Sequence, residues 1–231
     1  AKTVICVSEF TQQRMFAAGV QPRASQIIPN GADQTEFTLL PAEWVERVRD
    51  EWGLTDARVL ITVGNVTERK GQEVVIRALP QVLEHVPNTC YLIVGLPTKQ
   101  QEYEELAREL GVARQVRFLG RVDQETLVGL LNVADVFVMT SRHTSAGDFE
   151  GYGIAVVEAA LCGKPAVVSN NSGLVEAVAD GKTGIAVPQN DPVATAQAIV
   201  SLLTDKFKWV YLFRDARQRA LNEQTWAIRA M

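Results

Sequence analysis

Residues 59–64 read Val-Leu-Ile-Thr-Val-Gly, a short apolar run without alternation of polar and apolar residues. Such a run is typical of a strand buried on both faces, as in a parallel sheet. A polar turn follows, and then apolar residues recur at helical spacing, namely Val75, Leu79, Val82, Leu83 and Val86. Because Pro80 lies within this pattern, we expect a kink there or a helix shorter than the periodicity indicates.

The same strand–helix unit recurs along the chain. Further strand-like runs occupy 90–94, 116–119, 136–139, 166–169 and 184–187. Asp123 and Asp191-Pro192 are typical helix starts, and a helix is expected from about 153 to 162. Strands that alternate with helices predict an α/β fold, a doubly wound, Rossmann-like parallel sheet with helices on both faces. Ligands of such sheets bind outside the carboxyl ends of the strands.

Length and composition are those of an ordinary globular protein. The 231 residues include 47% apolar and 22% charged residues, and the net charge is −4. At about 150 residues per domain, this length predicts one large domain, or one domain with an appendage. The composition excludes a disordered tail, a collagen-like repeat and a disulfide scaffold. No basic run occurs, so the usual electrostatic signature of nucleic-acid binding is missing, and no nucleic-acid partner is expected.

The cysteines indicate the cellular compartment, and the first residues indicate whether the chain is a piece of a longer protein. Cys6, Cys90 and Cys162 are odd in number and far apart, which is typical of reduced thiols in a cytoplasmic protein. No apolar run approaches the ~18 residues of a membrane span, and no signal segment is recognisable. Since the chain begins Ala1-Lys2-Thr3 and continues at once into a strand-like run, we expect a piece of a longer protein.

The stretch with the strongest chemical signal is Glu-Gly-Tyr-Gly-Ile-Ala-Val-Val-Glu at 150–158. Gly151 and Gly153 would let backbone amides approach a ligand, and the first turn of the helix that follows offers free N–H groups to a phosphate. An extended ligand such as a nucleotide sugar could contact both Glu150 and Glu158. The alternative is that the glycines merely start a helix. A glycosidase pair is disfavoured, because eight helical residues span about 12 Å, more than such a pair allows.

A second candidate is the loop Asn-Val-Thr-Glu-Arg-Lys-Gly at 65–71, which follows the first buried strand. Lys70, beside a helix start at a strand's carboxyl end, is placed to neutralise a diphosphate. The alternative is an exposed lysine in a polar turn. The glycines after the next two strands, Gly95 and Gly120, could leave room for a base or a ribose, although glycine commonly follows a strand without any such role. No Asp-x-Asp occurs, so no metal site is expected to bridge a diphosphate.

Taken in order, these segments resemble the C-terminal half of a GT-B-fold retaining glycosyltransferase of the E-x7-E group, also described as family-4-like or group 1. The resemblance covers nearly the whole chain. It rests on Val7-Ser8-Glu9, Ile28 to Asp33, Val63-Gly64 with Lys70-Gly71, Phe118-Leu119-Gly120, Ala134-Asp135-Val136, Glu150 to Glu158 with Ala159, Gly163 and Pro165, Asp180 to Gly184, and Trp226.

The resemblance implies a role for each matching position. Lys70 would bind the donor pyrophosphate and act in catalysis with Glu150, and Glu158 would bind the ribose hydroxyls. The backbone of Gly151, Tyr152, Gly153 and Ile154 would face the transferred sugar and its phosphate. The remaining expected donor-binding residues are Gly64, Asn65, Arg69, Leu96, Arg121 and Val122.

The resemblance also implies the organisation of the protein. Residues 1–33 would close an N-terminal domain and form the linker, 34–204 would be the nucleotide-sugar-binding domain, and 205–231 a C-terminal helical segment. The expected partners are a nucleoside-diphosphate sugar and the missing N-terminal domain. No cofactor or metal is expected, and the protein would be cytoplasmic, with any membrane attachment supplied by the absent half.

Two positions depart from the family pattern. Asn65 stands where the family has an arginine, and either Arg69 compensates or donor affinity is reduced. Ser172-Gly173 stands where the family has a pair of glycines. Because the missing N-terminal domain would hold most of the acceptor site, we expect a donor-binding fragment that is inactive without that domain. Two alternatives remain open, a non-catalytic nucleotide-sugar-binding module of the same fold and half of a nucleotide-sugar epimerase.

Overall fold

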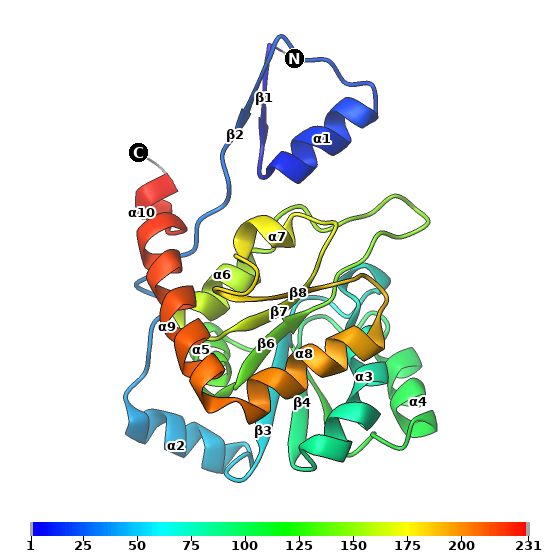
Figure 1. Cartoon of the computed structure of the whole chain (residues 1–231), viewed down its shortest axis with the longest axis vertical. Helices are drawn as coiled ribbons and strands as arrows, with labels where there is room; N and C mark the ends of the chain where they lie inside the picture. Colours follow the sequence, from blue (N-terminus) through cyan, green and yellow to red (C-terminus); the bar gives the residue numbers. More distant parts are fainter. Residues whose placement is uncertain (1, 230–231) are drawn as a thin grey trace.

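The computed structural model describes residues 2–229, and its centre is a six-stranded parallel sheet (Figure 1). The strand order is β5-β4-β3-β6-β7-β8. Their bounds are β3 Arg58–Val63, β4 Thr89–Val94, β5 Val116–Gly120, β6 Val136–Met139, β7 Ala166–Ser169 and β8 Gly184–Val187. The predicted doubly wound sheet is confirmed, and each predicted strand lies within one or two residues of its observed position.

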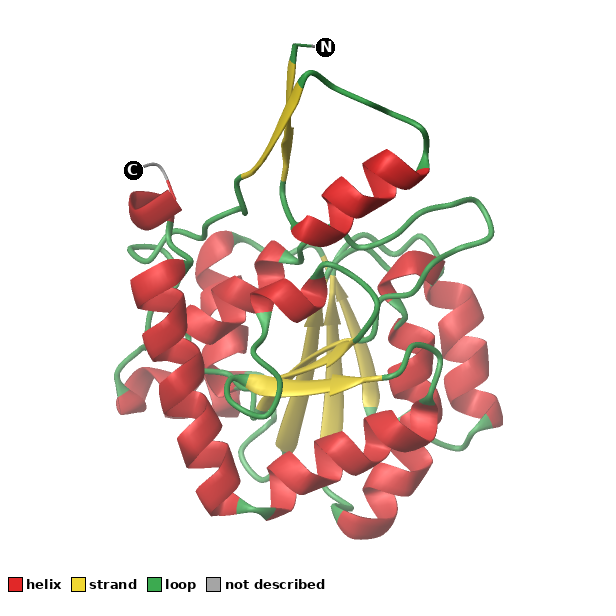
Figure 2. Cartoon of the chain, turned by 45° about the horizontal axis from the view of Figure 1, so that its top comes forward, coloured by secondary structure: helices red, strands yellow, loops and turns green. Residues whose placement is uncertain are grey.

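Helices cover both faces of this sheet (Figure 2). On one face lie α3 Gln72–His85, α4 Gln100–Glu109 and α8 Pro192–Thr204, and on the other α2 Ala42–Glu51, α5 Gln124–Val133, α6 Ile154–Leu161 and α9 Lys206–Glu223. Successive strand residues point to opposite cores, so Phe137 packs with the α5 and α6 side and Val138 with the α3 and α8 side. Burial on both faces explains why these strands are apolar throughout.

The strand order reverses between β3 and β6, which are neighbours in the sheet. From β3 the chain moves outward to β4 and β5, and from β6 outward to β7 and β8. The loops that leave β3 and β6 therefore diverge and open a crevice at the carboxyl edge, the usual ligand position in such sheets. Both predicted motifs, 65–71 and 150–158, lie on these two connections.

Helix α3 continues through Pro80 and ends at His85, so of the two outcomes expected from the sequence, a kink or a shorter helix, the shorter helix is wrong. The proline removes one backbone donor. However, Ile76, Leu79 and Val82 are each fully buried on either side of it. Packing of this apolar face outweighs the local cost of the proline.

The first residues form a separate unit above the carboxyl edge of the sheet (Figure 1). Strands β1 Thr3–Cys6 and β2 Ala24–Ile27 pair in parallel, and α1 Glu9–Ala17 connects them. The chain then descends to α2, while α9 and the short α10 Trp226–Arg229 return toward the same unit. The segment after β2 and the segment between α9 and α10 are hydrogen-bonded to each other. The Ala32 N–H donates to Gln224 O at 3.0 Å, and the Trp226 N–H donates to Ala32 O at 3.2 Å.

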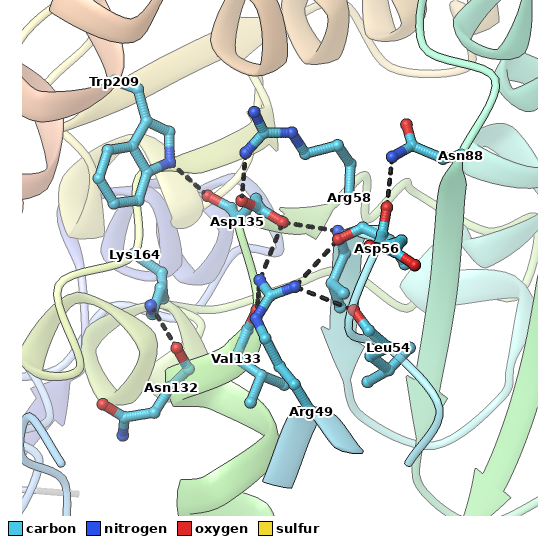
Figure 3. Close-up of polar contacts among 12 residues, drawn as sticks. Arg49, Leu54, Asp56, Arg58, Asn88, Asn132, Val133, Asp135, Lys164 and Trp209 are labelled. Carbon is cyan, nitrogen blue, oxygen red and sulfur yellow. Dashed lines mark hydrogen bonds and ion pairs between the residues drawn. The ribbon is translucent and has the colours of Figure 1, made fainter. Parts of the chain in front are cut away.

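At the opposite, amino edge of the sheet, Asp135 lies at the centre of a network of hydrogen bonds and ion pairs (Figure 3). Its carboxylate accepts from Arg58 at 3.2 Å and from the Val59 N–H at 2.7 Å, and it lies 3.5 Å from Arg49. Its backbone carbonyl accepts from the Trp209 indole at 2.7 Å. One aspartate thus joins α2, β3, β6 and α9. Within residues 2–229, no helix combines the length and the apolar character needed to cross a bilayer.

Candidate functional site

The loop after β3 places two cations at the crevice. Glu68–Lys70 form a short 3-10 turn, and Gly71 follows with φ +68°. A Cβ at Gly71 would lie 2.0 Å from Thr140 O at the end of β6, so only glycine lets the two loops approach this closely. The Lys70 side chain passes over Gly64, and a Cβ added to Gly64 would lie 3.0 Å from Cε of Lys70. The turn therefore directs Lys70 back across the end of β3.

Both cations reach the same carboxylate. Lys70 Nζ lies 2.7 Å and Arg69 NH1 2.5 Å from Oε2 of Glu150, and Ser141 Oγ lies 3.5 Å from that oxygen. The side chains of Lys70 and Glu150 are 13% and 11% exposed, so water screens this pair less than a surface pair. The structure thus brings together Arg69, Lys70 and Glu150, which the sequence assigned to two separate motifs.

Helix α6 begins directly after this carboxylate. Gly153 has φ +84°, and a Cβ there would lie 2.3 Å from Leu174, so the turn into the helix requires glycine. The Tyr152 side chain is 2% exposed and packs in the core, which leaves only its backbone for a ligand. Gly151 and Ile154 are half-buried at the same opening.

Glu158 follows inside α6, and its surroundings disfavour its charge. Burial and, to a lesser extent, the nearby Glu36 raise the pKa of Glu158, Lys70 lowers it, and the net result is a pKa of about 7. Lys70 is thus one of the charges that act on Glu158. Glu36, which comes from the linker after β2, has no motif in the sequence that would have singled it out.

The loop after β7 supports the backbone of the Glu150 segment. Gly173 N–H donates to Glu150 O at 3.0 Å, and a Cβ on Gly173 would lie 1.9 Å from Gly151 O. Ser172, the other half of the altered glycine pair, is buried and donates to Ser169 O at 3.3 Å. Ser172 therefore bonds within its own loop. The residue that packs closely against the Gly151 carbonyl is Gly173, the glycine of the pair that this chain retains.

The ends of β4 and β5 complete the edge. Gly64 N–H donates to Val94 O, and Gly95 N–H to Gly120 O, each at 2.8 Å. Leu96 is 44% exposed, and its N–H donates to Asn65 Oδ1 at 3.3 Å. Beyond β5, Arg121 is exposed and Val122 half-buried. These positions lie on loops beside the β3 loop, and the described contacts do not join them to Glu150.

Arg142 is a further residue that the sequence interpretation missed. The Arg142 guanidinium binds Glu73 at 2.7 Å and Glu68 at 3.2 Å, and the backbone N–H of Arg142 donates to Arg69 O at 2.9 Å. It therefore holds the 3-10 turn against α3 and the loop after β6. Only the fold brings Arg142 to Glu68, because more than 70 residues separate them in the chain.

The arrangement is suited to an anion. Two cations, a half-buried helix start and glycine-bounded loops converge where parallel strands end, which together favour a phosphate group. A cavity of about 240 Å³ lies beside Arg69, lined also by Asn65, Thr67, Glu68, Thr144, Ser145, Ala146 and Asp148. Among residues 2–229, no group of three or more His, Cys, Asp or Glu side chains is placed to hold a metal ion.

Comparison with known proteins identifies related chains. The family model described as "Glycosyl transferases group 1" matches residues 45–222. A GDP-mannose-dependent alpha-(1-6)-phosphatidylinositol monomannoside mannosyltransferase of Mycolicibacterium smegmatis is 36% identical over 230 residues, which is 99% of this chain and 60% of that protein. A D-inositol 3-phosphate glycosyltransferase of Corynebacterium efficiens is 33% identical over 90% of this chain and 49% of its own length.

Solved structures show the same fold. The Anabaena protein HepE, crystallised with UDP and glucose, superposes with a TM-score of 0.89 at 25% identity, over 99% of this chain and 61% of its own. A C-terminal domain of a glycosyl transferase group 1 protein from Francisella tularensis gives a TM-score of 0.70 at 18% identity, over 85% of this chain and all of that domain. The chain spans about 60% of the length of the first curated relative.

Proposed function

Since the chain belongs to the glycosyl transferases group 1 family, we propose that it is the donor-binding part of an enzyme that moves a sugar from a nucleoside-diphosphate sugar to an acceptor hydroxyl. The convergence of Lys70 and Arg69 on Glu150, at the carboxyl edge of the sheet, carries this proposal. The similar protein HepE, which was crystallised with UDP and glucose, supports a nucleotide as the ligand.

In the proposed arrangement, Lys70 and Arg69 bind the diphosphate, and the backbone from Gly151 to Ile154 faces the sugar and its phosphate. Glu158 binds the ribose hydroxyls, and Leu96, Arg121 and Val122 line the base. When the sugar is transferred, its C1–O bond to the diphosphate breaks and C1 bonds to the acceptor oxygen. The proton of the acceptor hydroxyl passes to the leaving diphosphate oxygen. Negative charge then grows on the leaving diphosphate, and preorganised cations stabilise that charge.

Glu150 has a second role in this proposal. It faces the sugar as positive charge develops at C1, and its carboxylate stabilises that charge. A diphosphate that approaches Lys70 competes with Glu150 for the same ammonium group, which would release the carboxylate toward the sugar. Independence of metal ions is a further part of the proposal, since Lys70 and Arg69 supply positive charge that a metal provides elsewhere. Retention of configuration is another part, and it rests on the resemblance to the E-x7-E group.

The small unit of β1, α1 and β2 favours the view that more of the protein lies above the crevice. Two-stranded sheets are marginal alone, and Ile5, Phe16 and Val20 of this unit are 62%, 48% and 48% exposed. We propose that they pack against an N-terminal domain which supplies the acceptor site, and that residues 1–33, 34–204 and 205–231 divide as expected from the sequence. Without that domain the chain would bind donor but not transfer sugar.

Isothermal titration of the chain with GDP, UDP and ADP, and with GDP-mannose and UDP-glucose, tests the proposal. We expect one nucleotide to bind, with GDP favoured by the 36% identical mannosyltransferase, and binding to persist in EDTA. Loss of binding in Lys70→Ala would support the site. If no nucleotide binds, or if Lys70→Ala binds as wild type, the proposed donor site is wrong.

Transfer to an added acceptor separates the remaining candidates. Detectable transfer by the chain alone would overturn the expectation that it is inactive. Donor binding together with an unchanged turnover in Glu150→Gln of the longer protein would favour a non-catalytic module. Interconversion of the bound sugar without an acceptor would favour an epimerase.

A further inference from the structure

The backbone of the Glu150 segment is held from outside its own domain. Ser8 Oγ, at the start of α1, donates to Gly151 O at 2.6 Å. Thr11 Oγ1 also lies within reach of the Ser8 hydroxyl, at 3.0 Å, but the Gly151 carbonyl is closer and the Thr11 hydroxyl donates its own proton to Ser8 O. Ser8 Oγ accepts in turn from the Thr11 N–H at 2.9 Å. Ser8 therefore caps α1 and binds the Glu150 segment with the same oxygen.

The start of α1 also binds the four-residue helix α7 Leu174–Ala177. The Glu176 carboxylate accepts from the N–H groups of Glu9 and Phe10 at 2.8 and 2.9 Å. A carboxylate at a helix N-terminus satisfies donors that the helix itself leaves free, and it is favoured by the helix dipole. Glu176 therefore fastens α1 to the loop after β7.

That loop leads back to Glu150. Gly173, at the start of α7, donates to Glu150 O and lies against Gly151 O. At the other end of α7, Arg219 donates to the carbonyls of Glu176 and Ala177 at 3.0 Å, which anchors α7 to α9. The carbonyls of both Glu150 and Gly151 are thus fixed by groups whose positions depend on α1 or α7.

Apolar contacts support the same joint from the other side. The Phe10 ring meets Phe149 edge-on at 5.4 Å, and the Arg14 guanidinium lies 5.7 Å from the centre of the Phe149 ring. Phe149 directly precedes Glu150. Helix α1 therefore touches residues 149 and 151, on both sides of the carboxylate that holds Lys70.

We propose that Ser8 and Glu176 form a latch through which α1 sets the position of the Glu150 segment, so that both act as positioning residues for the sugar end of the donor. This inference rests on the proposed function. Because Lys70, Arg69 and Glu158 do not contact the latch directly in the described structure, loosening it should affect the transferred sugar more than the nucleotide.

The first test measures amide hydrogen exchange in the chain itself. In Ser8→Ala and Glu176→Ala, the Gly173 amide, which bonds to Glu150 O, should exchange about tenfold faster, the change expected when a bond worth about 1–1.5 kcal/mol is lost. Ser8→Thr keeps the hydroxyl and should restore slow exchange. Glu84→Ala, at an exposed position on α3, is the control. Unchanged exchange at Gly173 in both variants overturns the latch.

The second test compares two ligands. For the nucleotide sugar that binds the wild-type chain, Ser8→Ala and Glu176→Ala should weaken binding about five- to tenfold, while the affinity for the free nucleotide stays within about twofold. Equal weakening of both ligands, or of neither, overturns the positioning role. Thr11→Val, which removes the capping hydroxyl but leaves the Ser8–Gly151 bond, should weaken the sugar conjugate less than Ser8→Ala. If the wild-type chain binds no nucleotide, the proposed function fails, and hydrogen exchange alone decides the latch.

Discussion

Lys70 and Glu150 stand 80 residues apart in the chain, and their side chains meet at 2.7 Å across the switch point of the sheet. Arg69 reaches the same carboxylate oxygen, so Glu150 keeps one cationic partner if the other is removed. Because Glu150 has two cationic partners, the contribution of Arg69 and Lys70 to ligand binding can be measured separately from their contribution to stability. Loss of one cation should reduce ligand binding without unfolding the protein.

We therefore predict that Lys70→Ala lowers the nucleotide diphosphate affinity by about 1.5–3 kcal/mol, or roughly 10- to 150-fold. The free energy of unfolding should change little, because Arg69 still neutralises Glu150. Titration calorimetry and urea unfolding measure the two effects. Lys206→Ala removes an exposed lysine at the start of α9, which lines a cavity with Asp135 away from Lys70, and it should leave the affinity unchanged. A Lys70 variant that unfolds but binds normally would contradict this prediction.

A double-mutant cycle of Arg69→Ala and Lys70→Ala should be non-additive. Both cations contact Oε2 of Glu150, and residues that share a partner show coupling energies of about 0.5–3 kcal/mol. We expect the double variant to lose more stability than the two single variants together, because the half-buried Glu150 is then left without a cation. Additive losses of stability would show that the two ion pairs are independent.

The sheet could be predicted from the sequence because burial on both faces makes each strand an apolar run, which is a local signal. The path of α3 could not, since the contacts that carry the chain through Pro80 come from strands and from α8. Lys70 and Glu150 were assigned to separate motifs for the same reason: their distance depends on where β3 and β6 lie in the sheet.

Other parts of the site left no readable pattern. Glu36, Ser141 and Arg142 are ordinary residues in polar segments, and only the fold brings them to Glu158, Glu150 and Glu68. Ser8 and Glu176 lie more than 160 residues apart, and neither marks a ligand by itself. Local motifs therefore predicted candidate residues on the loops at the carboxyl edge of the sheet, whereas the residues that support these loops could be found only from the structure.

The pKa of Glu158, raised to about 7 by burial and then by Glu36, gives a test by pH. Between its ordinary value of 4.5 and about 7, the folded chain holds a proton that the unfolded chain has lost. This contribution to stability therefore falls as pH rises through that window. Relative to wild type, Glu158→Gln should become more stable on going from pH 4 to pH 8.

Thermal unfolding at both pH values measures this difference. Glu36→Gln removes the neighbouring charge and should lower the pKa of Glu158, which weakens the dependence on pH without abolishing it. Glu105→Gln, an exposed position on α4, is the control. If the stability difference between Glu158→Gln and wild type is the same at pH 4 and pH 8, Glu158 does not titrate in this range.

Gly173→Ala should be costly for a purely steric reason. The φ of Gly173 is −64°, which alanine adopts freely, but its Cβ would lie 1.9 Å from Gly151 O. We expect a loss of about 1–3 kcal/mol or more, typical of overpacking, together with weaker binding of the nucleotide sugar as the Glu150 segment is displaced. Urea unfolding measures the first effect.

Gly129→Ala provides the matched comparison for Gly173. It lies within α5, and its Cβ would meet Val48 at 3.4 Å, an ordinary contact. Alanine is favoured over glycine in helices by about 0.8–1.0 kcal/mol, so this variant should be neutral or more stable. Equal losses in both variants would mean that the contact with Gly151 is not what makes Gly173 necessary.

The Asp135 network at the amino edge should affect stability and not the ligand. Asp135→Ala leaves the half-buried Arg49 and the Val59 N–H without their carboxylate partner. Removing one partner of a buried pair costs roughly 3–5 kcal/mol of the free energy of unfolding. Because Arg58 is exposed, we expect a loss toward the lower end of this range. Nucleotide affinity should stay unchanged, because the network lies across the sheet from Lys70. Asp56→Ala, an exposed carboxylate near the same edge, should be neutral by both measures. A change in affinity with unchanged stability would show that the two edges of the sheet are coupled, and Lys70 would then owe its position to more than the loops that surround it.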